Sequence, residues 1–171
     1  MNKLFVAVAA TLLAACQSTS DEPLRATAAL QPTKGSKAFG EATFEEVDGK
    51  VRVVVFAQGL RPDRAHGFHI HEAGDCSSGD GMSTKGHFNP HGKPHGDPKS
   101  AERHAGDLPA LNAAKDGRAM LDVTMDIITV RPGPASVVGR GLIIHADPDD
   151  YKTQPTGNAG ARIACGVIKA G

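Results

Sequence analysis

Histidine is the residue type whose number and placement suggest chemistry in this chain of 171 residues. All eight histidines lie between positions 66 and 145. His69 and His71 are two residues apart in a stretch that favours a strand, so both imidazoles project from the same face. Two imidazoles on one face are half of a metal site, although such a pair taken alone is more often an exposed polar face. His145 follows the apolar residues 142–144 and is well placed to join the pair from a neighbouring strand.

A second set of metal-ligand types lies in the segment 73–112, which is rich in Gly, Pro, Asp and His and has no alternating apolar pattern. This segment contains His87, His95, His104 and Asp107, at spacings of 8, 9 and 3 residues. Three imidazoles and one carboxylate suit a closed tetrahedral zinc site. Zinc binding would also explain how so polar a loop is held in place.

The two remaining histidines are expected to lie outside these sets. His66 immediately precedes the strand motif and is interpreted as a packing or hydrogen-bonding residue. His91 lies in the loop between His87 and His95, and its sequence position leaves two interpretations, a merely exposed side chain or one that captures stray metal.

Other kinds of chemistry find no support in the sequence. It contains no Gly-x-Ser-x-Gly elbow, no Gly-x-x-x-x-Gly-Lys loop and no dinucleotide fingerprint. The 19 Lys and Arg residues equal the 19 Asp and Glu residues, so the formal net charge is zero. A nucleic-acid-binding protein would show a basic excess, so we expect no nucleic-acid partner.

The elements that must position the histidines are predicted to be short strands. The many glycines (20) and prolines (11), with only 4% aromatic residues, favour turns between strands over a helical bundle. Alternating apolar residues over 39–46 and 50–57, joined by Asp48-Gly49, predict a β-hairpin. Further strands are predicted at 26–31, 66–72, 118–124, 141–146 and 161–169, and no helix is predicted beyond a turn or two. We therefore expect an all-β fold, an antiparallel β-sandwich or flattened barrel with two long functional loops.

The start of the chain indicates an export signal. Lys3 is followed by an apolar run over residues 4–15, which is too short to span a bilayer and has the length of a secretory signal. The sequence Leu-Ala-Ala-Cys at 13–16 resembles the bacterial lipobox, in which the signal is cut before a cysteine that receives lipid. We expect a signal peptide over 1–15, a lipidated Cys16 and flexible tether over 16–25, and one domain over 26–171. The protein is then exported to the periplasm and anchored to a membrane through the lipid on Cys16.

Two cysteines, Cys76 and Cys165, remain in the expected domain. In an oxidising compartment an isolated pair is most simply a disulfide. Two thiolate metal ligands are the alternative, which no Cys-x-x-Cys spacing supports.

Five sequence blocks resemble the copper/zinc superoxide dismutases, especially the exported bacterial members of that family. In order along the chain they are Gly-Phe-His-Ile-His-Glu-Ala-Gly-Asp-Cys (67–76), Gly-His-Phe-Asn-Pro (86–90), His-Ala-Gly-Asp-Leu (104–108), Gly-Leu-Ile-Ile-His-Ala (141–146) and Gly-Asn-Ala-Gly-Ala-Arg-Ile-Ala-Cys-Gly (157–166). The resemblance covers the chain from about residue 26 to its end. It implies a Greek-key β-sandwich and the disproportionation of superoxide to oxygen and hydrogen peroxide, with one copper and one zinc ion per subunit.

The resemblance also implies a role for each matched residue. The implied copper ligands are His69, His71, His87 and His145. The implied zinc ligands are His87, His95, His104 and Asp107. The sharing of His87 comes from the family pattern alone, because spacing does not predict it. The same pattern pairs Cys76 with Cys165, makes Arg162 a guide for the anion beside copper, and makes Asp149 the carboxylate that links one copper-binding to one zinc-binding histidine.

The implied mechanism divides the work between the two metals. Copper changes valence and zinc cannot, so zinc orders the loop and tunes His87, which supplies a proton. A positive focus at the site is expected to steer superoxide. The stretch 150–156 is short compared with the charged guiding loop of eukaryotic members, and the subunit state stays open between a monomer and a homodimer. The alternative function is that of a non-catalytic periplasmic copper/zinc-binding protein on the same fold.

Overall fold

The computed structural model of the chain describes residues 23–171. The signal peptide expected over 1–15, the lipid on Cys16 and the tether up to residue 22 lie outside the described residues. Within the described range, no helix has the length and apolar character needed to cross a membrane.

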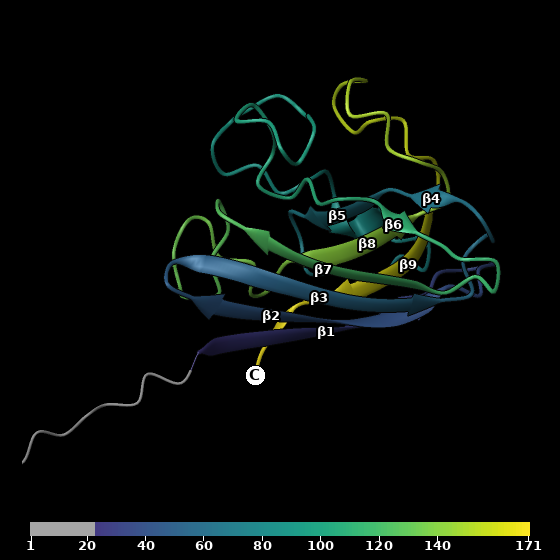
Figure 1. The fold of residues 1–171 in the computed structure, drawn as a ribbon, viewed down its shortest axis with the longest axis horizontal. Coiled ribbons are helices and arrows are strands. Elements are labelled where there is room, and N and C mark those ends of the chain that lie inside the picture. The colour runs from purple at the N-terminus through teal and green to yellow at the C-terminus, as the bar shows by residue number, and fades with distance from the viewer. Residues whose placement is uncertain (1–22) are drawn as a thin grey trace, which may run out of the picture.

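Residues 23–171 form ten strands and one short 3-10 turn, shown in Figure 1. All pairings between these strands are antiparallel. The elements are β1 (Leu24–Pro32), β2 (Phe39–Val47), β3 (Lys50–Gln58), β4 (Ala65–His66), β5 (Phe68–His71), η1 (Met82–Thr84), β6 (Leu111–Asn112), β7 (Ala119–Met125), β8 (Gly141–His145), β9 (Arg162–Val167) and β10 (Lys169–Ala170).

The order of the strands confirms the Greek-key expectation. The main sheet has the order β5-β8-β9-β1-β2-β3-β7, with β10 beside β1, and β4 pairs with β6 in a small separate sheet. Strands β1, β2 and β3 follow one another, whereas β9 returns from far along the chain to lie beside β1. Figure 1 shows β1, β2, β3 and β7 in one layer, with β5, β8 and β9 in a second, so the sheet curves into a flattened barrel.

The predicted hairpin is confirmed, and two other predicted strands are interrupted. Asp48 and Gly49 have φ values of 51° and 74° between β2 and β3, as a tight hairpin turn requires. The strand predicted over 66–72 is divided at Gly67, because His66 pairs with β6 while Phe68 pairs with β8. A Cβ on Gly67 would lie 2.7 Å from the Cβ of Ala159, so only glycine fits at this position.

The strand predicted over 161–169 is likewise divided, because β9 pairs with β8 and β1 whereas β10 continues along β1 alone. The small strand β6, at the end of the segment predicted as a loop, was not predicted. A two-residue strand is too short to show an alternating pattern.

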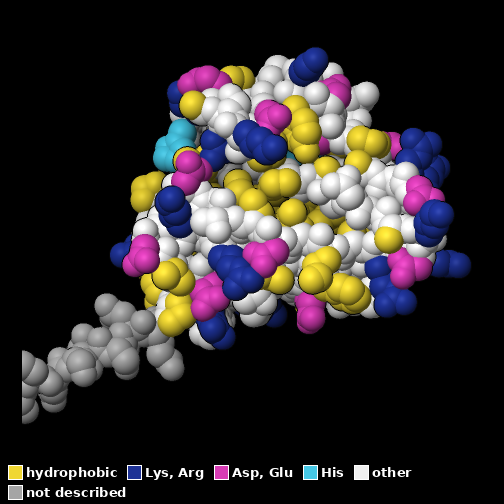
Figure 2. Space-filling model, in the orientation of Figure 1, with side chains coloured by type: hydrophobic (Ala, Val, Ile, Leu, Met, Phe, Trp, Pro, Cys, Tyr) yellow, Lys and Arg dark blue, Asp and Glu magenta, His cyan; other side chains and the backbone are white. Residues whose placement is uncertain are grey.

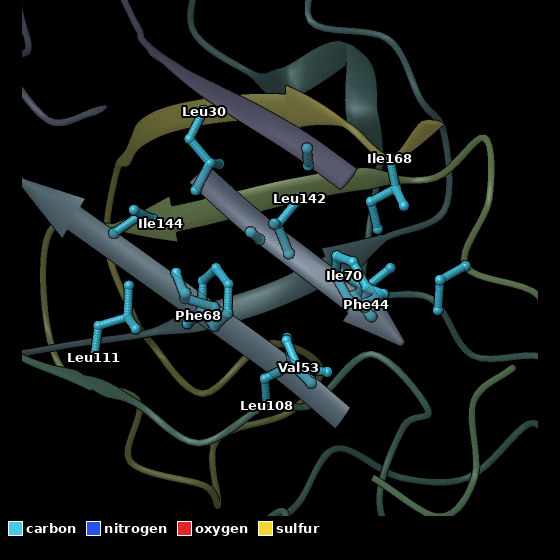
Figure 3. Packing of buried hydrophobic residues seen from close by; sticks show 14 of the residues in the cluster. Leu30, Phe44, Val53, Phe68, Ile70, Leu108, Leu111, Leu142, Ile144 and Ile168 are labelled. Atoms are coloured by element: carbon cyan, nitrogen blue, oxygen red, sulfur yellow. The ribbon is translucent and has the colours of Figure 1, made fainter. Parts of the chain in front are cut away.

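The core lies between the two layers. Figure 3 shows Phe44 and Val53 from one layer facing Phe68, Ile70 and Leu142 from the other, and all five are fully buried. Each such side chain stabilises the fold by about 1.5–3 kcal/mol. Alternate residues of β5 point away from this core, yet every residue of β5 is buried. The outer face of β5 is therefore covered by a loop, and that covered face carries the histidine pair.

A buried carboxylate anchors the segment between β7 and β8. The side chain of Glu46, at the end of β2, is 1% exposed. It accepts hydrogen bonds from the backbone N–H groups of Val130 (2.7 Å) and Arg131 (2.8 Å) and from the Arg131 guanidinium. Burial alone would raise the pKa of Glu46, but these bonds and the Arg131 charge outweigh it and hold that pKa below its ordinary value.

We expect Glu46→Ala to lower the free energy of unfolding by about 2–4 kcal/mol, because it leaves two backbone N–H groups without their acceptor. Arg131→Ala is the control and is expected to lose less than about 1 kcal/mol, since that side chain is 61% exposed. A lowered folded-state pKa contributes stability above the unfolded pKa of about 4.3 and loses it as the pH falls. Urea unfolding of the metal-free protein at pH 7 and pH 3 should therefore show the gap between wild type and Glu46→Ala narrowing in acid. An equal difference in unfolding free energy at the two pH values would contradict the stabilising role of the Glu46 charge.

Candidate metal centre

Four histidines from three parts of the chain converge on one point. His69 and His71 lie on the outer face of β5, and His145 ends β8, which pairs with β5. His87 arrives from the long loop, where it forms a bridge with His71. All four side chains are buried, and each offers one ring nitrogen within 4.8 Å of the others. We call these residues the first group.

The nitrogens at the centre of the first group have no hydrogen-bond partner. They are His69 Nδ1, His71 Nε2, His87 Nε2 and His145 Nε2. The Nδ1 atoms of His71 and His145 donate to the carbonyl oxygens of Lys85 (2.8 Å) and Gly160 (3.2 Å), which fixes the proton there. Their Nε2 atoms are then bare lone pairs. An unpaired buried polar atom costs about 1–3 kcal/mol, so four of them facing one point fit a bound metal ion.

A second group lies on the other side of His87. The Oδ1 atom of Asp107 is 2.9 Å from His87 Nδ1, 3.0 Å from His95 Nδ1 and 3.5 Å from His104 Nδ1. The other carboxylate oxygen of Asp107 accepts the backbone N–H groups of His104 (2.9 Å) and Gly96 (3.0 Å). The carboxylate is thus fixed by backbone, and three nitrogens and one oxygen form the donor set of a tetrahedral zinc site.

His87 is the one described residue that belongs to both groups. Its Nε2 faces the first group and its Nδ1 faces Asp107. Burial lowers the pKa of His87 to about 4, against the opposing effect of Asp107, so the ring is neutral at pH 7. The structure therefore brings together, in two adjoining groups, the seven residues that the sequence pointed to as ligands.

Asp149 connects the two groups from the loop 146–160. Its Oδ2 is 2.6 Å from His69 Nε2, and its Oδ1 is 3.0 Å from His95 Nε2. Burial would raise the pKa of Asp149, but these two contacts outweigh it and place that pKa well below its ordinary value. Burial would lower the pKa of His95, but Asp107 and Asp149, one at each ring nitrogen, raise it to about 9. The ionised Asp149 thus sets which nitrogen of each ring is left to face a metal.

We expect Asp149→Ala to weaken zinc binding about 10–100-fold, the usual effect of removing a group that orients a metal ligand. The variant frees Nε2 of both His69 and His95, so both rings lose their orientation. Competition with a zinc chelator measures the affinity, and Asp150→Ala, which changes the neighbouring exposed carboxylate, is the control. Equal zinc affinity in Asp149→Ala and wild type would contradict this role.

Arg162 lies beside the first group, at the start of β9. Its guanidinium donates to the carbonyl oxygens of Gly81 (2.7 Å) and Lys85 (2.6 Å) and to Thr84 Oγ1 (2.9 Å). The Lys85 carbonyl also accepts from His71, so one oxygen contacts both the cation and the first group. Among residues 23–171 no carboxylate forms a salt bridge with Arg162, so its guanidinium is held in place by neutral acceptors.

The disulfide between Cys76 and Cys165 fixes the segment that holds Arg162. It joins positions 89 apart in sequence, with a Cα–Cα distance of 5.9 Å. This pairing confirms the expected disulfide and leaves neither sulfur as a thiolate ligand. The disulfide ties β9, which begins at Arg162, to the loop that carries the three acceptors of the Arg162 guanidinium.

The two histidines expected outside the groups are found outside them. His66 is 1% exposed, and its Nδ1 is 2.8 Å from the backbone oxygen of His145, so it supports the end of β8. His91 is exposed and belongs to neither group. The role of Thr84 was missed from the sequence, because it joins residues 78 positions apart and a lone threonine in a polar loop gives no signal.

Comparisons with known proteins agree with this geometry. The family model described as copper/zinc superoxide dismutase matches residues 38–168. The protein named superoxide dismutase [Cu-Zn] 2 from Aquifex aeolicus is 40% identical over 173 residues, with 99% of this chain and 100% of that protein covered. Superoxide dismutase [Cu-Zn] from Paramecium bursaria Chlorella virus 1 is also 40% identical, over 96% of this chain and 89% of its own length.

A solved structure gives the same result at the level of the fold. The crystal structure described as the clock protein EA4 superposes with a TM-score of 0.79 and 42% identity, over 86% of this chain and 95% of that one. The match of the family model alone covers well over half of the chain. The chain belongs to the copper/zinc superoxide dismutase family.

Proposed function

We propose that this protein is an enzyme that disproportionates superoxide to oxygen and hydrogen peroxide, with one copper and one zinc ion per subunit. The observation that carries the proposal is the meeting of four unpartnered imidazole nitrogens, one of them on a ring whose other nitrogen faces a second donor set. A store for a single metal has no need of a histidine shared between two groups.

The donor sets suggest which metal each group would hold. The first group offers only imidazole nitrogen, which suits copper, and would hold it through His69, His71, His87 and His145. The second group, with His87, His95, His104 and Asp107, would hold zinc. Copper bound in the first group supplies a one-electron valence change, which zinc lacks.

The residues of this chain would do the remaining work. His87 can hold a proton at Nε2, on the side of the first group, while Asp107 keeps its Nδ1 directed at the second group. Asp149 prevents the rings of His69 and His95 from turning, because it contacts Nε2 of both. Arg162 would bind the anion beside the first group, since its guanidinium is held there by neutral acceptors and forms no salt bridge with a carboxylate among the described residues.

Attraction of superoxide would depend on local charge. The chain is neutral overall, and Figure 2 shows acidic and basic side chains interspersed over one face. A chain without net charge attracts an anion weakly from a distance, so a positive focus at the site would steer superoxide at close range.

We expect Arg162→Ala to lower the rate constant for superoxide decay at least about tenfold, within the range in which steering acts. The wild-type rate constant should also fall as ionic strength rises, and that dependence should flatten in the variant. The control is Arg52→Ala, which removes the same charge from an exposed pair with Asp122 on the barrel. A wild-type rate constant that does not change with salt, or an equal loss in Arg52→Ala, would contradict this role.

For the cell, we propose export to the periplasm and anchoring through a lipid on Cys16. The support is the apolar run over 4–15, the Leu-Ala-Ala-Cys sequence and the disulfide, which is typical of oxidising compartments. In a bacterial host, wild type should incorporate labelled palmitate and sediment with membranes, and Cys16→Ser should do neither. Membrane association that survives Cys16→Ser would overturn the anchor.

A further inference from the structure

Gln154 contacts the backbone of one histidine in the second group. It lies in the loop 146–160, which also carries Asp149, and Figure 1 shows that loop (yellow) rising on the same side of the barrel as the long loop that carries His95 (teal). The Gln154 Oε1 accepts the backbone N–H of His95 at 2.9 Å, and its Nε2 donates to the backbone carbonyl of His95 at 2.8 Å. One side-chain amide thus pairs with both polar groups of one residue, as a neighbouring strand would.

His95 has no other backbone support within the described chain. It lies outside every strand, and no backbone–backbone hydrogen bond involves its N–H or its carbonyl. Its ring is held by Asp107 at Nδ1 and by Asp149 at Nε2. The loop 146–160 therefore holds His95 twice, through Asp149 at the ring and through Gln154 at the backbone.

We propose that Gln154 is a positioning residue for zinc: it fixes the backbone of His95 so that Nδ1 stays directed at the second group. The proposal rests on the proposed binding of zinc by that group. Gln154 and His95 are 59 positions apart and lie in different loops, so their contact also couples the position of the loop 146–160 to the retention of zinc.

The chemistry of the amide makes the contact specific. Gln154 offers one acceptor and one donor in a fixed planar arrangement, which matches the acceptor and donor of a peptide group. A glutamate at this position would still accept from the His95 N–H but would place a second oxygen against the His95 carbonyl. Gln154 is exposed, so its replacement leaves the core unchanged and the variants are expected to fold.

The test is the rate at which the fully metal-loaded protein loses zinc to a colorimetric chelator at pH 7. We expect roughly thirtyfold faster release in Gln154→Ala, the fold-change that corresponds to two hydrogen bonds of about 1 kcal/mol each, with Gln154→Glu between that variant and wild type. The matched control is Thr153→Ala, which removes a hydrogen bond to Asp150 within the same loop (2.6 Å) but touches nothing on His95. We expect Thr153→Ala to release zinc at nearly the wild-type rate.

A second readout separates positioning from a general loosening of the loop. Cobalt(II) placed in the second group reports the ligand arrangement through its visible spectrum, which should shift in Gln154→Ala and stay unchanged in Thr153→Ala. If Gln154→Ala releases zinc at the wild-type rate, or if Thr153→Ala accelerates zinc release as much as Gln154→Ala does, the role of Gln154 is overturned and the proposed function is left intact. A wild type that binds no zinc would overturn both.

Discussion

Replacing His87 by alanine is expected to weaken the binding of both metals and to lower superoxide decay per protein more than about 100-fold, since even residues that only orient a metal ligand contribute 10–100-fold. Among the described residues, His87 alone contributes a nitrogen to each group. The variant leaves three imidazoles in the first group and two imidazoles with one carboxylate in the second. It also removes the one ring that can hold a proton between the two groups.

The long loop offers a matched control for this prediction. His91 is the same residue type, lies four residues away and is exposed outside both groups, so His91→Ala should keep both metals and full activity. His104→Ala removes a ligand from the second group alone and should weaken zinc binding while the four nitrogens of the first group remain. Metal content after dialysis and the decay of pulse-generated superoxide measure the two effects. A His87→Ala protein that loses one metal and retains the other at wild-type affinity would contradict the shared role.

Removing the disulfide is expected to have the largest effect on stability. The double variant Cys76→Ala and Cys165→Ala frees a loop of some ninety residues, which in the chain-entropy account is worth roughly 4.6 kcal/mol. For a domain of this size, such a loss corresponds to a fall in Tm of about 10–15 °C. Alanine suits the site because Cys165 is 5% exposed and lies in the core sheet.

The same variant should also reduce the rate of superoxide decay when it is measured well below its Tm. The loop released from β9 carries the Gly81 and Lys85 carbonyls and the Thr84 hydroxyl that fix the guanidinium of Arg162. Thermal unfolding of the metal-free proteins gives the stability effect without a contribution from metal binding. A difference in unfolding free energy below about 1 kcal/mol would contradict the constraint assigned to this disulfide.

Local patterns in the sequence predict most of the fold. The alternation over β2 and β3 and the turn at Asp48 and Gly49 depend only on neighbouring residues, so the hairpin is where the pattern places it. The breaks at Gly67 and after Val167 were not predicted, because each arises where the chain changes strand partners far away in sequence.

The candidate site divides in a similar way. Residue type and spacing indicate seven ligands, and the strand period explains why His69 and His71 share a face. Ring orientation depends on distant acceptors such as the Lys85 and Gly160 carbonyls, and no spacing rule gives those contacts. The support of Arg162 by Thr84 and of His95 by Gln154 joins loops that have no pattern of their own.

The most direct test of the account is the decay of pulse-generated superoxide as copper is added to the zinc-loaded protein. The account predicts a rate that rises linearly to one copper per chain and then stays constant, with a rate constant near the diffusional limit of about 10⁹ M⁻¹ s⁻¹. Removal of copper should abolish the acceleration. A protein that binds one copper and one zinc ion yet does not accelerate the decay would contradict the account and would be a metal-binding protein without this catalytic activity.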